Sequence, residues 1–145
     1  MHTGTQMTHT RAPRFFVSFG LWLLQALLAT VFLAHGGLLL APPADIAAMM
    51  NAQFPRAFWV FLGVAEVLAA AGLILPGVTR IRPRLIIWAC MGLMIVMVSA
   101  TVLHLARGET SSAVTTTILL GLVTLVAYGR ARVRPIVARR SAAGR

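Results

Sequence analysis

The chain has 145 residues, of which 59% are hydrophobic and 11% are charged, and its mean hydropathy is +0.85. This composition is typical of a membrane protein and excludes a soluble domain with a charged surface. The formal net charge is +10, and all 13 basic side chains are arginines. Because these arginines flank apolar segments, they indicate membrane topology, and we expect no nucleic-acid partner.

The polar residues 1–14 show no periodicity and predict a flexible cytoplasmic arm. Four apolar segments follow, at residues 15–40, 57–75, 85–105 and 114–128. A helix of about 20 residues crosses a hydrocarbon core of roughly 30 Å, and continuous apolar segments favour helices over a barrel. The sequence therefore predicts an all-α fold, an integral membrane four-helix bundle over residues 15–130 with an Arg-rich cytoplasmic tail at residues 131–145.

Two of the four segments have unusual lengths. The first is nearly twice as long as the apolar part of a secretory signal and contains Gln25 and His35, which favours a retained helix. The fourth is short for a span, so we expect its helix to extend into the flanking residues.

The arginines also predict the orientation of the bundle. With four crossings, 11 arginines share the side of the two termini and 2 lie on the opposite side. Positively charged loops remain in the cytoplasm, so we predict that the N- and C-termini are both cytoplasmic. The sparsely charged side has Arg56 and Arg107.

The first outer loop, residues 41–56, predicts a short amphipathic helix at the outer membrane surface. A helix would place four apolar side chains on one face, with Asp45 as its N-cap and Trp59 as an aromatic anchor. These four side chains are Ile46, Met49, Met50 and Phe54. An irregular loop is the alternative interpretation.

Glu66 lies near the middle of the second apolar segment. A carboxyl group in the bilayer core costs about 2.5 kcal/mol or more, so it normally faces the protein interior and has a partner. His35, His104 and Arg107 lie towards the outer ends of their segments and are the candidate partners. We therefore predict a buried polar cluster of Glu66, His35, His104 and Arg107, which is either a ligand or proton site or a structural clamp between helices.

Other chemistry has little support in the sequence. The only cysteine, Cys90, excludes an intramolecular disulfide and a CxxC site, and we expect no metal. Two histidines in one leaflet suggest a bis-His haem, but their helices would be diagonal in an up-down bundle, which argues against haem. The motifs HExxH, GxSxG, GxGxxG and the P-loop are absent, so we predict no catalytic residues.

Three stretches carry a family resemblance: residues 31–37 (VFLAHGG), 62–76 (LGVAEVLAAAGLILP) and 102–109 (VLHLARGE). Together they resemble the DoxX-like family of small bacterial four-helix membrane proteins. The resemblance implies an inner-membrane, multi-pass protein that is linked to quinone-coupled redox systems. Members often have a G-x-x-K pattern late in the first helix, whereas this chain has leucine in place of the lysine after Gly36.

Three functions follow from these patterns. The first is a DoxX-like subunit of a quinone-linked redox system, without catalysis of its own, with a quinone or lipid ligand near Glu66. The second is a structural accessory subunit of a larger respiratory or photosynthetic membrane complex. The third is a small proton-coupled transporter. All three place the chain in the lipid bilayer, and the first two require other membrane subunits as partners.

Overall fold

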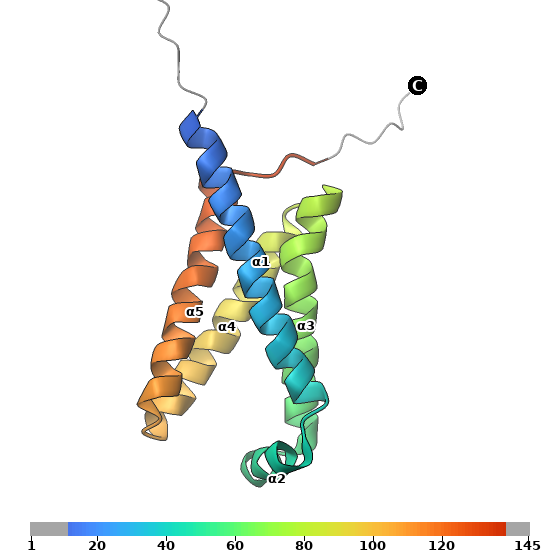
Figure 1. Cartoon of the computed structure of the whole chain (residues 1–145), viewed down its shortest axis with the longest axis vertical. Helices are drawn as coiled ribbons and strands as arrows, with labels where there is room; N and C mark the ends of the chain where they lie inside the picture. The colour runs from blue at the N-terminus through green and yellow to red at the C-terminus, as the bar shows by residue number, and fades with distance from the viewer. Residues whose placement is uncertain (1–11, 139–145) are drawn as a thin grey trace, which may run out of the picture.

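The computed structural model describes residues 12–138, which form five α-helices and a short π-helical turn (Figure 1). The described chain contains no strand. The elements are α1 (Ala12–Leu40), α2 (Ala44–Gln53), α3 (Arg56–Thr79), α4 (Leu85–Ala106), α5 (Thr110–Tyr128) and η1 (Gly129–Val133). The predicted arm and tail lie partly outside the described residues, and α1 begins three residues before the predicted start of the bundle.

Four helices are long and apolar enough to cross a membrane, as the sequence predicts: α1, α3, α4 and α5 with η1. The fourth span covers Thr110–Val133, so it does extend into its flanking residues. The second span continues to Thr79, beyond the predicted end at residue 75, although Pro76 lies inside it. Proline removes one backbone hydrogen bond, and packing against neighbouring helices lets a membrane helix continue through it.

The bundle consists of two closely packed helix pairs, α1 with α3 and α4 with α5, which are joined through contacts between α3 and α4. Its core is made of buried apolar side chains, among them Leu28, Phe32, Leu73, Leu93 and Val123. In Figure 1, α1 and α5 approach each other at the end where the described chain begins and ends, and they diverge towards the opposite end.

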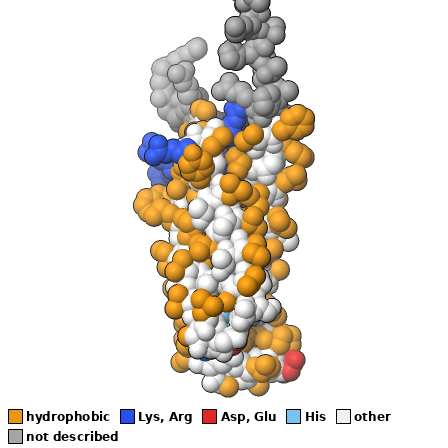
Figure 2. All heavy atoms as spheres, turned by 90° about the vertical axis from the view of Figure 1, so that its left-hand side faces the viewer, with side chains coloured by type: hydrophobic (Ala, Val, Ile, Leu, Met, Phe, Trp, Pro, Cys, Tyr) orange, Lys and Arg blue, Asp and Glu red, His pale blue; other side chains and the backbone are white. Residues whose placement is uncertain are grey.

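The surface of the bundle is apolar over most of its length (Figure 2). Large side chains such as Phe61, Leu68 and Ile95 are 66–70% exposed along the spans. In water this exposed area would drive aggregation, whereas in a bilayer it contacts lipid tails. The surface therefore agrees with four membrane-spanning helices and with lipid contact around the bundle.

The loop between α1 and α3 contains a helix, α2, whose details differ from those predicted. Pro43 and not Asp45 is its N-cap, and Asp45 lies in the first turn. Of the predicted apolar face, Met50 is buried against the bundle and Met49 is 68% exposed. The position of α2 at the outer membrane surface stays a prediction, as does the cytoplasmic location of the termini.

Hydrogen bonds from the start of α3 hold both α2 and the end of α1. The indole Nε1–H of Trp59 donates to the carbonyl oxygens of Met50 at 2.9 Å and Phe54 at 3.2 Å. The Arg56 guanidinium donates to the carbonyl oxygens of Leu39 and Leu40 at the end of α1. The last carbonyls of a helix lack partners within it, so Arg56 caps α1 and holds it against the start of α3.

Candidate functional site

The candidate site lies where α1 and α3 cross at very short range. Gly36 of α1 faces Gly63 of α3, and a Cβ atom added to Gly36 would lie 2.9 Å from the Gly63 carbonyl oxygen. A Cβ atom added to Gly63 would lie 2.8 Å from the Gly36 carbonyl oxygen. Because both residues lack side chains, the two backbones come into direct contact. The residues that flank this contact are therefore held at fixed positions.

Glu66 is three residues after Gly63 and is 1% exposed, so its carboxylate is enclosed between the helices. It is paired with His35, the neighbour of Gly36, through a hydrogen bond of 2.6 Å between His35 Nδ1 and Glu66 Oε2. This contact supplies the partner that a carboxyl group in a membrane span requires.

The two members of the pair differ in their access to the surroundings. The His35 side chain is 52% exposed, whereas Glu66 is buried. Among the described residues, Nε2 of His35 has no hydrogen-bond partner. The imidazole thus connects the buried carboxylate to the surface of the bundle and leaves one ring nitrogen available to a ligand.

The other two predicted cluster residues lie elsewhere and do not contact Glu66. His104, in the last turn of α4, pairs with Glu109 through a hydrogen bond of 2.5 Å between Nδ1 and Oε2. Arg107 donates from Nη1 to Gln53 Oε1 at 2.5 Å, and its guanidinium lies 5.3 Å from the centre of the Phe54 ring. The bond between His104 and Glu109 therefore spans the α4–α5 turn, and Arg107 links that turn to α2 near one end of the bundle.

A second buried polar network was not predicted. Gln25 of α1 donates from Nε2 to the carbonyl oxygen of Leu73 in α3 at 2.6 Å. Its Oε1 accepts a hydrogen bond of 2.5 Å from Nε of Arg130, which follows α5 in η1. In the sequence, Arg130 belongs to the arginine-rich side of the bundle and is typical of a topology signal. The missed clue is Gln25, because an amide inside an apolar helix needs a partner on a neighbouring helix.

Within residues 12–138, no three His, Cys, Asp or Glu side chains are grouped closely enough to hold a metal ion. The His35–Glu66 pair can form hydrogen bonds and exchange protons through its two side chains.

Comparison with known proteins identifies the family. No curated protein and no solved structure gives a significant match to the chain. A family model described as the DoxX-like family matches residues 23–127, which include α3, α4 and the His35–Glu66 pair. The match extends over more than half of the sequence, so this four-span membrane protein belongs to the DoxX-like family.

Proposed function

We propose that the protein is a bacterial inner-membrane subunit of a quinone-linked redox system, without catalysis of its own, and that His35 and Glu66 bind a quinone. The observation that carries this proposal is the half-exposed imidazole hydrogen-bonded to a buried carboxylate within the membrane spans. Ionisable groups at this depth are costly, and they mark ligand or proton sites more often than not.

The chemistry of the pair suits both redox states of a quinone. An oxidised quinone presents carbonyl oxygens that accept hydrogen bonds, and a quinol presents hydroxyl groups that also donate them. A neutral imidazole has one N–H donor and one acceptor nitrogen, so the hydrogen bond between Nδ1 and Glu66 decides what Nε2 of His35 does. When Nδ1 donates to an ionised Glu66, Nε2 accepts from a quinol hydroxyl. When Glu66 carries the proton and Nδ1 accepts it, Nε2–H donates to a quinone carbonyl, so a proton shift within the pair matches each redox form.

The surroundings favour a lipid-soluble ligand over a water-soluble one. Next to the pair, exposed side chains on α1 and α3 are apolar, including Val31, Leu38 and Val64. A hydrogen bond formed in such apolar surroundings is stronger than the same bond in water. The alternative is that the pair only clamps α1 to α3, in which case no ligand binds at Nε2.

The test measures quinone binding by the full chain in lipid nanodiscs. A photoreactive short-chain ubiquinone analogue is crosslinked to the protein, and the labelled peptide is identified by mass spectrometry. We expect labelling of α1 or α3 beside His35 and a loss of about tenfold in labelling for His35→Gln, the factor for one hydrogen bond of about 1.4 kcal/mol. Glu66→Gln is expected to weaken labelling while the protein still inserts into the membrane.

The chain provides a matched control for this experiment. His104 is also a histidine paired with a glutamate, but it lies in the last turn of α4 and its partner Glu109 is exposed. His104→Gln should leave quinone labelling unchanged. Equal labelling of wild type, His35→Gln and His104→Gln would leave the pair with only a structural role and would overturn the proposed quinone site.

A subunit of a redox system also needs partner subunits. The apolar side chains exposed on all four spans provide surfaces on which other membrane helices can pack. Mild solubilisation of the native membrane followed by native mass spectrometry is expected to show the 15.6 kDa chain within a larger complex.

A further inference from the structure

Arg130 is a buried cation that has no counter-ion among residues 12–138. Its side chain is 5% exposed, its Nε–H donates to Gln25, and its guanidinium lies 5.0 Å from the centre of the Trp22 ring. Its Nη2 atom is buried and has no hydrogen-bond partner. The chain has three acidic side chains, all within the described residues, and none contacts Arg130. A buried charge in this state is expensive unless an anion pairs with it.

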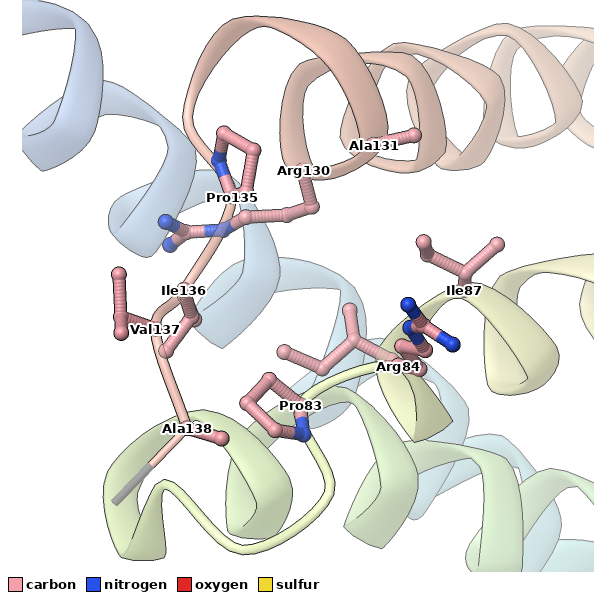
Figure 3. Close-up of a pocket in the computed structure, with 10 residues that line it drawn as sticks. Pro83, Arg84, Ile87, Arg130, Ala131, Pro135, Ile136, Val137 and Ala138 are labelled. Carbon is pink, nitrogen blue, oxygen red and sulfur yellow. The ribbon is translucent and has the colours of Figure 1, made fainter. Parts of the chain in front are cut away.

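Two adjoining cavities open beside Arg130, with volumes of about 460 and 370 Å³. Arg130 lines both of them, and further arginines lie on their walls, with Arg84 in the larger cavity and Arg80 and Arg134 in the smaller one. Figure 3 shows the segment from Pro135 to Ala138 running across the larger cavity, past the side chain of Arg130. The larger cavity therefore has two arginines in its lining and the smaller cavity has three.

The α3–α4 loop holds one of these arginines in a strained conformation. Arg80 and Arg82 have φ angles of 57° and 47°, a region that favours glycine. Non-glycine residues rarely adopt this region, and such strain is common at ligand sites. Arg80 lines the smaller cavity, whereas Arg82 lines neither. A glycine at position 80 would relieve the strain but would remove a positive charge from the cavity wall.

From these observations we infer that the arginine-lined cavities bind an anionic phosphate group, with the guanidinium of Arg130 in the wall that the two cavities share. Phosphate oxygens accept several hydrogen bonds at once, and the planar guanidinium matches them in pairs. The larger cavity also has apolar walls formed by Ile86, Ile87 and Ile136, which suit the first carbons of an acyl chain. The phosphate group therefore comes from an anionic lipid, or from free phosphate that enters from the aqueous side.

The test uses the full chain in a neutral detergent and measures bound ligand by native mass spectrometry. Three probes are compared: dioleoylphosphatidylglycerol, dioleoylphosphatidylcholine with the same acyl chains, and inorganic phosphate. We expect the phosphatidylglycerol to bind more tightly than the phosphatidylcholine. Arg80→Gly should weaken its binding about fivefold, since each arginine near an anionic headgroup contributes about that factor. Arg130→Gln should weaken it further.

Arg82→Gly is the matched control, because it removes the same charge and the same backbone strain without touching a cavity. Arg82→Gly should leave lipid binding unchanged. It also shows whether weaker lipid binding by Arg80→Gly comes from misfolding of the loop. Inorganic phosphate that displaces the lipid would identify free phosphate as the ligand, and lipid binding without displacement would identify the lipid. Equal binding of the two lipids, or equal losses in Arg80→Gly and Arg82→Gly, would overturn the inference.

Discussion

At the scale of single residues, two glycines decide how closely α1 and α3 pack. The glycine contact places His35 and Glu66 next to each other at the point where the two backbones meet. A larger residue at either glycine would push the helices apart, because the nearest atoms belong to backbone and cannot rotate away. The glycines thus act together with the hydrogen bond between His35 and Glu66 in holding the candidate site.

We predict that Gly36→Ala destabilises the protein by about 1–3 kcal/mol, the usual cost of overpacking a tight contact. The added methyl group would lie 2.9 Å from the Gly63 carbonyl oxygen and 3.1 Å from Cβ of Glu66. The measurement is the free energy of unfolding in detergent micelles, obtained by steric trapping.

The neighbouring Gly37 is the control for this substitution. An added Cβ atom at Gly37 has nothing within 4 Å, so Gly37→Ala should be neutral or slightly stabilising through its better helix propensity. A similar loss of stability for both variants would contradict a specific role for the contact between Gly36 and Gly63.

The residues of the site could be predicted from the sequence only in part. The cost of burying Glu66 required a partner and limited the choice to a few polar residues, one of which is His35. The choice among His35, His104 and Arg107 depends on how the helices are rotated about their axes, which composition does not determine. Arg130 was missed because an arginine next to an apolar segment is typical of a topology signal, and only the folded bundle brings it to Gln25.

At the scale of elements, the long helices could be predicted and the short one only approximately. Lipid offers no hydrogen-bond partners to the backbone, so a continuous apolar segment of about 20 residues crosses the membrane as a helix. The number of spanning helices therefore follows from the number of such segments. The details of α2 depend on tertiary contacts, since its last turn is held by Trp59 and Arg107 from other elements.

We predict that Trp59→Phe loosens α2 while the four spans stay folded. The substitution removes the hydrogen bonds to the carbonyl oxygens of Met50 and Phe54 but keeps an aromatic ring against Phe54 and Phe58. The loss should lower the free energy of local unfolding of α2 by about 1 kcal/mol. The rate of amide hydrogen exchange in residues 44–54, measured by mass spectrometry, should then rise about fivefold. Trp88→Phe is the control, because Trp88 is 66% exposed and its indole makes no hydrogen bond to the described residues. Unchanged exchange in Trp59→Phe would show that Arg107 alone holds α2.

At the scale of the whole molecule, charge is distributed unevenly between the two ends of the bundle. In Figure 2 the blue arginine side chains gather near one end and the red acidic side chains appear at the other. The arginine-rich end contains the cavities beside Arg130, and the opposite end contains α2 and the pair formed by His104 and Glu109. The positive-inside rule therefore predicts that the arginine-rich end faces the cytoplasm, which would place the inferred phosphate site at the anionic lipids of that leaflet.

We predict that Asn51→Cys and Ser111→Cys react with a membrane-impermeant maleimide added to intact spheroplasts, and that Ile81→Cys does not. All three positions are exposed, Asn51 in α2, Ser111 at the start of α5 and Ile81 in the α3–α4 loop. The native Cys90 is buried and should stay unlabelled, which makes wild type the background control. Ile81→Cys should react once the membrane is permeabilised, which shows that its thiol is accessible from the inner side. If Ile81→Cys is labelled in intact spheroplasts and the other two variants are protected, the orientation is opposite to the one predicted. The arginine-lined cavities would then lie on the outer face, away from the cytoplasmic leaflet.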